Sequence, residues 1–143
     1  MSPLQSLLLR LKEDMDPTML PGRDLDEALA AACGHEISWS QARFTGDCYP
    51  VITWHAPHPY VGMKEPCPLF IQSLDAMVGL IEAHLPGQLF QLMHAALDSW
   101  GHSSAYRGVK ALPHELPRFL CQCFVERLIS IQESEKASTG ASA

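Results

Sequence analysis

Four prolines lie within the twelve residues 57–68, and this concentration constrains the fold more than any other feature of the chain. Proline has no backbone N–H to donate and a nearly fixed φ, so it interrupts helices and central strands alike. We therefore expect an irregular segment here, with regular elements before and after it. Long ordered loops in small domains are either functional sites or simple spacers, and the sequence leaves both interpretations open.

A capped helix is predicted over residues 25–33. Asp24 is placed to cap its first turn, and Glu27 completes a capping-box pattern. Gly34 stands where a helix needs a left-handed residue at its C-terminus. The inward face of this helix would consist of Leu25, Ala28, Leu29 and Ala32.

A strand is predicted over residues 49–54, because β-branched and aromatic side chains dominate there. Pro50 cannot donate a ladder hydrogen bond, so we expect it at the start of the strand or on an edge. Trp39 and Phe44 are compatible with a second, shorter strand that would precede a turn at Gly46.

Two further helices are predicted after the proline segment. Ser73 is placed to cap the first of them, and Pro86 with Gly87 ends it. Pro117 fits the first turn of the second, and the small polar residues 134–143 are expected to be disordered. The predicted core faces consist of Leu74, Met77, Val78, Ile81 and Leu85 in the first helix, and of Leu116, Leu120, Cys123, Phe124, Leu128 and Ile131 in the second. The predicted solvent-facing stripe of the second consists of Arg118, Gln122, Glu126 and Glu133.

Residues 88–100 are compatible with two structures. Their apolar positions match a helical period, and their Leu, Met, Gln and Ala residues favour a helix. Read as a strand, the same segment is apolar on both faces, as a buried central strand would be. Residues 103–109 predict a further strand, for which Tyr106 and Val109 are the strongest indication.

The N-terminal segment predicts a short amphipathic helix that ends before Pro17. Its apolar stripe consists of Leu4, Leu7, Leu8, Leu11 and Met15. Two interpretations remain open. Either the stripe packs on its own domain, or Leu4, Leu8 and Leu11 bind a partner chain.

The composition indicates one domain with a substantial core, because 143 residues with 47% hydrophobic content bury enough surface to fold without disulfides. The net charge of −6 provides no electrostatic reason to expect nucleic acid as a partner. Five cysteines without a CxxC pair favour reduced thiols in a cytoplasm over a disulfide scaffold. No apolar run is long enough for a signal peptide or a membrane helix. We divide the chain into an N-terminal helix with linker (1–21), one α/β domain (22–133) and a tail (134–143).

Residues 66–85, with the sequence PCPLFIQSLDAMVGLIEAHL, resemble part of the phage ABA-sandwich domain, a family of small proteins encoded by phages and prophages. The resemblance covers roughly residues 22–131 and is carried by the helix from Asp24 to Gly34, by Pro68, Phe70 and Ser73-Leu74-Asp75-Ala76, and by Pro117 to Cys121. It implies helices packed on a small sheet, and it favours a strand over residues 88–97. It implies no functional residues.

One loop pattern is compatible with a metal site. His55 and His58 lie three positions apart, and Cys67 falls in the same loop. Zinc is bound by three or four such N and S ligands at tetrahedral positions. The spacing matches no standard zinc motif, and the alternative is a proline-rich surface loop with solvated histidines. The chain has no nucleophile elbow, phosphate-binding glycine loop or HExxH motif, so we expect neither an enzyme nor a cofactor other than this zinc.

These observations predict a small α/β (α+β) sandwich of two or three layers, with a largely antiparallel sheet of three or four strands flanked by helices. The leading functional hypothesis is a phage-encoded accessory protein in the bacterial host cytoplasm. It would bind another protein, and inhibition of a host defence system is one such use. The alternatives are a metal-binding or hydrolytic protein centred on His55, His58 and Cys67, and a homodimeric component that pairs through residues 4–15. Neither nucleic acid nor a membrane is expected as a partner.

Overall fold

The computed structural model describes residues 2–13, 23–107 and 115–141, and these form a small α+β fold. The predicted fold class is confirmed, since the described residues contain five helices and a three-stranded antiparallel sheet of order β1-β2-β3. The elements are α1 (Pro3–Glu13), α2 (Arg23–Ala32), β1 (Glu36–Gln41), β2 (Cys48–Thr53), β3 (Lys64–Pro66), α3 (Leu74–His84), α4 (Leu89–Arg107) and α5 (Leu116–Ala141).

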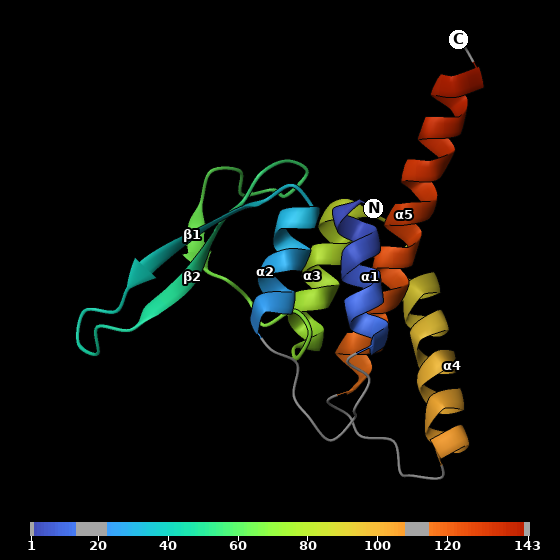
Figure 1. The fold of residues 1–143 in the computed structure, drawn as a ribbon, viewed down its shortest axis with the longest axis horizontal. Coiled ribbons are helices and arrows are strands. Elements are labelled where there is room, and N and C mark those ends of the chain that lie inside the picture. The colour runs from blue at the N-terminus through green and yellow to red at the C-terminus, as the bar shows by residue number, and fades with distance from the viewer. Residues whose placement is uncertain (1, 14–22, 108–114, 142–143) are drawn as a thin grey trace.

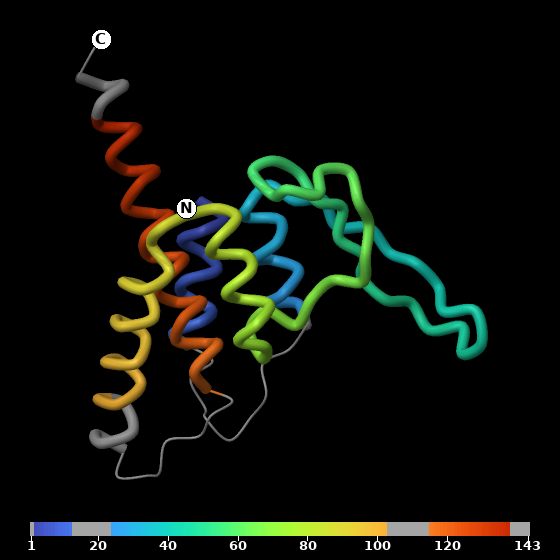
Figure 2. Tube along the Cα trace, turned by 180° about the vertical axis from the view of Figure 1, so that it is seen from behind, coloured from blue at the N-terminus to red at the C-terminus, as the bar shows by residue number. Residues whose placement is uncertain are grey.

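The helices lie side by side, and the hairpin of β1 and β2 extends away from them beyond α2 (Figure 1). Figure 2, a view from behind, shows the same hairpin extending away from the helices. We call this hairpin, residues 36–53, the arm. The first half of α5 packs among α1, α3 and α4, whereas its second half continues past the other helices.

The hydrophobic core lies among the helices and receives the inner end of β2. Leu120 and Phe124 of α5 are completely buried in it, and so is Ile52 of β2. Leu4, Leu7 and Leu11 of α1 belong to the same core, so α1 packs with the other helices in one unit. A division of the chain at residue 21 therefore has no counterpart in the packing.

The caps at two helix ends place the neighbouring segments. Gly34 has φ +91°, and its N–H donates to the Ala31 carbonyl while the His35 N–H donates to the Ala30 carbonyl, both at 3.0 Å. This pair of bonds is a Schellman motif, which reverses the chain and puts His35 directly before β1. At the start of α3, the Ser73 hydroxyl accepts from the Ala76 N–H at 3.3 Å, as the sequence predicted.

The start of α2 lies two residues before the predicted one. The helix begins at Arg23, so Asp24 lies in its first turn instead of capping it. There Asp24 forms an ion pair with Arg10 of α1, and its charge also suits the positive end of the helix dipole.

Residues 89–97 are helical, so the strand that the family resemblance favoured over residues 88–97 is wrong for this chain. The strand predicted over 103–109 is also wrong for residues 103–107, which belong to α4, while residues 108–109 lie outside the described part of the chain. Local propensity prevails because one helical stripe is enough to pack α4 on α5. Leu92 and Ala96 are buried in that stripe, while Phe90 is 85% exposed.

Two predictions about α5 are corrected. Its helix continues to Ala141, where a disordered tail was expected, because no proline follows Pro117 and each added residue gains a backbone hydrogen bond. Arg118 was assigned to the solvent-facing stripe but is only 6% exposed. Its guanidinium donates to the Leu11 carbonyl at 3.0 Å, near the C-terminus of α1, where a cation is favoured.

Candidate functional site

The proline segment forms a closed loop between β2 and β3, and we call residues 55–63 the anchored loop. Its two ends are joined by backbone hydrogen bonds. The Trp54 N–H donates to the Met63 carbonyl at 3.0 Å, and the Gly62 N–H donates to the Trp54 carbonyl at 2.7 Å. Gly62 has φ +87°, which glycine adopts without the penalty of a side chain. These bonds continue the pairing of β2 with β3 and hold the loop against the sheet.

An aromatic stack fixes the middle of the anchored loop. The His58 ring lies on the Trp54 indole with a centroid separation of 3.8 Å and an interplanar angle of 12°. The Tyr60 N–H donates to His58 Nδ1 at 3.1 Å, so the neutral His58 ring carries its proton on Nε2. Trp54 is itself buried and lies roughly perpendicular to the rings of Phe70 and His35. The exposed part of the loop is therefore tied to the core through Trp54.

A pair of histidines fastens this region to the helices. His35 Nε2 lies 2.7 Å from His84 Nε2, and His35 Nδ1 accepts from the His55 backbone N–H at 3.1 Å. Since Nδ1 accepts, a neutral His35 ring must carry its proton on Nε2, and this N–H donates a hydrogen bond to His84 Nε2. His35 follows α2, His84 ends α3, and His55 follows β2. One ring thus joins two helices to the start of the anchored loop.

The surroundings of these histidines favour their neutral forms. Burial, followed by the neighbouring charges of His84, His58 and His55, lowers the pKa of His35 from 6.5 to about 4. Burial and then His58 lower the pKa of His84. Burial also lowers the pKa of His58, although the Glu65 carboxylate opposes this. Near neutral pH these shifts favour the neutral forms of His35, His84 and His58, so the His35–His84 contact is a hydrogen bond without repulsion.

The anchored loop presents apolar side chains to solvent. Tyr60, Val61 and Met63 are 63%, 59% and 58% exposed, and they occupy three of four consecutive positions. The Tyr60 ring also lies 5.6 Å from the His58 ring, so the exposed side chains are continuous with the buried stack. At the far end of the arm, Phe44 is 97% exposed.

The structure does not bring the predicted zinc ligands together. The His55 side chain points to Glu36, with His55 Nε2 3.6 Å from Glu36 Oε2, while His58 stacks on Trp54. Cys67 is buried at the other end of β3, where its Sγ donates to the Pro68 carbonyl at 3.7 Å. Among residues 2–13, 23–107 and 115–141, no group of three or more His, Cys, Asp or Glu side chains is arranged to hold a metal ion.

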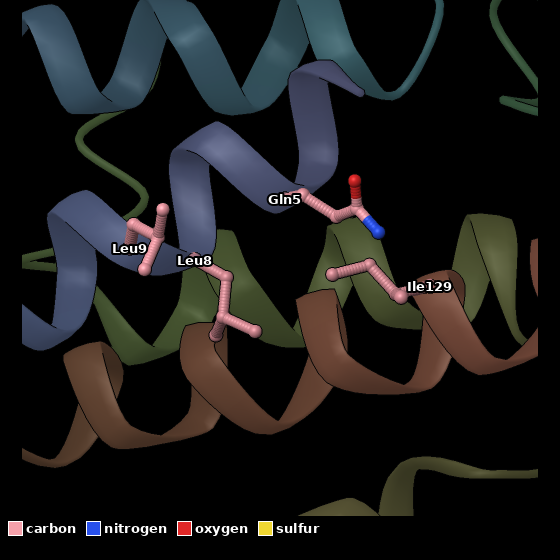
Figure 3. Close-up of a pocket in the computed structure, with 4 residues that line it drawn as sticks. All are labelled: Gln5, Leu8, Leu9 and Ile129. Atoms are coloured by element: carbon pink, nitrogen blue, oxygen red, sulfur yellow. The ribbon is translucent and has the colours of Figure 1, made fainter. Parts of the chain in front are cut away.

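The three leucines predicted to bind a partner have different positions. Leu4 and Leu11 are buried in the core of their own chain. Leu8 is half-buried and lines a shallow groove of about 580 Å³ between α1 and α5, together with Gln5, Leu9 and Ile129 (Figure 3). The leucine stripe is thus used mainly for intramolecular packing.

Burial holds three of the five thiols in the protonated form. All five cysteines are free, as the sequence indicated. Burial raises the pKa of Cys33 to about 12, and it also raises the pKa values of Cys121 and Cys123. A thiol with a raised pKa remains protonated and is a poor nucleophile. Within the described part of the chain, no helix has the length and apolar character needed to cross a membrane.

Sequence reasoning identified the loop but missed its anchor. His35 and His84 are 49 positions apart, and no spacing rule connects the two residues. The one available signal was the predicted Gly34 cap, which places the next residue against the helix it terminates. In comparisons with known proteins, no family model, no curated protein and no solved structure matches the chain.

Proposed function

We propose that the protein acts by binding another protein through the anchored loop. The proposal rests on one observation: the backbone of this loop is held in place, yet its apolar side chains are exposed to solvent. Tyr60, Val61 and Met63 face solvent, yet the loop is closed by backbone bonds to Trp54 and stacked through His58. Contiguous apolar exposure is a mark of interaction surfaces, and a preorganised loop loses little entropy when it binds.

The composition of the loop favours a protein as the partner. An exposed tyrosine beside aliphatic side chains is typical of the centre of a protein interface, where aromatic anchors contribute most of the affinity. Glu36 and Glu65 are exposed near the loop, and the whole chain carries a net charge of −6. Acidic groups around an apolar centre would steer the loop toward a basic surface.

The wider role is part of the same proposal. The resemblance to phage ABA-sandwich proteins supports a phage-encoded accessory protein that acts in the bacterial host cytoplasm. Occupying a basic surface of a host defence component is one way in which an acidic protein of this size would act.

The test is a comparison of protein captured from host lysate by three immobilised forms of the full chain. The first is the wild type, and the second carries Tyr60→Ser and Met63→Ser. The third carries Phe90→Ser, which removes a comparably exposed apolar side chain from α4. We expect one specific partner to be retained by the wild type and the Phe90→Ser control, and to be lost from the loop variant.

Two results would refute the proposal. One is that the wild type, at near-native concentration, retains no specific protein. The other is that the loop variant retains the same partner as the wild type. Because all three substituted side chains are mainly exposed, equal urea midpoints should show that the variants remain folded.

A further inference from the structure

In the sheet formed by the described residues, β1 is an edge strand, and its outer side carries a regular set of outward-facing backbone groups. The Pro50 carbonyl of β2 accepts from the Cys67 N–H at 2.9 Å, so the backbone groups of Pro50 face β3. Trp39 is the partner of Pro50 on β1. Because opposed residues in an antiparallel pair alternate between bonded and non-bonded, Trp39 directs its own N–H and C=O away from β2. Ile37 and Gln41, two positions to either side, do the same.

The hairpin turn supports this assignment independently. The Ala42 N–H donates to the Asp47 carbonyl at 2.8 Å, which makes residue 42 an inward-facing position. Backbone direction alternates along a strand, so the backbone groups of Ser40 and Ser38 also face β2. Those of Ile37, Trp39 and Gln41 face outward. The outer edge of β1 therefore offers three N–H donors and three C=O acceptors at strand spacing.

The two edges of the sheet differ in whether a further strand can pair with them. β3 has three residues and contains Lys64 and Pro66, features that discourage further strand pairing. Residues 37–41 of β1 contain neither a proline nor a charged side chain. A sheet with one open edge and one blocked edge can pair once, so its self-association ends at two copies.

The open edge is complementary to itself. In an antiparallel pair of two β1 strands with the twofold axis at Trp39, the outward-facing residues meet outward-facing residues. Trp39 lies opposite Trp39, and Ile37 lies opposite Gln41 of the other copy. Glu36 meets the uncharged Ala42, so no like charges are opposed. The Trp39 side chain is 58% exposed, and directly opposed aromatic residues stabilise a strand pair.

We propose that the protein forms a twofold dimer in which β1 pairs antiparallel with β1 of a second copy, centred on Trp39. The three outward-facing residues of each copy would exchange about six backbone hydrogen bonds across the axis. The two three-stranded sheets would become one six-stranded sheet. The anchored loop lies at the β3 side of the sheet, so the dimer leaves it accessible, and this inference does not depend on the proposed function.

The experiment measures the molar mass of the full chain by light scattering after size exclusion, over about 5–200 µM. Trp39→Pro removes an outward N–H while leaving the bonds between β1 and β2 in place. Trp39→Thr removes the same side chain but keeps the N–H. We expect twice the chain mass for the wild type, a dimer with weaker concentration dependence for Trp39→Thr, and the single chain mass for Trp39→Pro.

A second measurement remains informative if Trp39→Pro folds poorly. In a Cys48→Ser background, Trp39→Cys should form a disulfide between copies under mild oxidation, since directly opposed residues lie about 5.5 Å apart. Ser40→Cys should not, since its two copies are offset by two positions. A monomeric wild type across the whole range, a dimer retained by folded Trp39→Pro, or equal crosslinking of both cysteine variants would overturn the inference. None of these results would alter the loop-dependent capture test.

Discussion

Acidification should destabilise the protein through the histidine pair that fastens the arm to the helices. His35 has a folded-state pKa of about 4 against an ordinary value of 6.5. Between these two values the unfolded chain binds a proton that the folded chain excludes, so stability rises with pH. The contribution of His35 is fully present above pH 6.5 and is lost as the pH falls toward 4.

The magnitude follows from the two pKa values. Between about pH 8 and pH 5, linkage for His35 alone predicts a loss of about 2 kcal/mol in the free energy of unfolding. His84 and His58 also have lowered pKa values and add to the loss in the same direction. Protonation would also remove the acceptor at His35 Nδ1 that holds the His55 N–H. The loss should therefore be accompanied by loosening at the base of the arm.

The assay is urea unfolding followed by circular dichroism, with the free energy of unfolding determined at several pH values between 8 and 5. His35→Gln removes the titrating group, and its pH dependence should be shallower by about 2 kcal/mol over the same range. His94→Gln, on the exposed surface of α4, is the matched control and should keep the wild-type dependence. A wild-type stability that is constant over this range, or a His35→Gln slope equal to that of the wild type, would refute the reasoning.

Three further predictions concern stability and use the same unfolding assay. Ser73→Ala should lower the free energy of unfolding by about 1 kcal/mol because the Ala76 N–H loses its capping acceptor. A loss below a few tenths of a kcal/mol would show that this cap contributes little to stability. Gly34→Ala should lower the free energy of unfolding by about 1–2 kcal/mol because φ is +91° there. Gly79→Ala, inside α3, should instead raise it by about 0.5–1 kcal/mol. Equal effects of the two substitutions would contradict the role of the left-handed cap. Leu11→Ala should lower the free energy of unfolding by about 2–5 kcal/mol because its side chain is completely buried. Leu9→Ala, whose side chain is 44% exposed, should lower it much less. A small effect of Leu11→Ala would mean that α1 is not part of the core.

The elements that were predicted well are those specified by bonds within a few residues. The Ser73 cap, the Gly34 terminus and the strand around residues 49–54 all depend on local donors, acceptors and β-branched side chains. Residues 89–97 follow the same rule. Their local composition favoured a helix, and the helix is what the structure contains.

The candidate site was only partly predictable. The concentration of prolines identified the anchored loop, and His58 was singled out there for its possible role as a metal ligand. The structure instead uses His58 as a ring stacked on Trp54. Sequence spacing cannot distinguish a ligand from a stacking partner, because the difference lies in which other side chains approach the ring.

The sequence by itself determined the start of α3 at Ser73, the end of α2 at Gly34 and the place where the chain becomes irregular, and it indicated that the thiols are free. A cap or a proline acts through hydrogen bonds and torsion angles within one turn, so these features are encoded locally. Only the tertiary structure decided that α1 belongs to the core, that Arg118 is buried and that His35 meets His84. Those outcomes depend on which surfaces of distant segments come together, and that is set by the packing of the whole chain. The open edge of β1 arises in the same way, because a strand is an edge only when no other part of the chain pairs with its outer side.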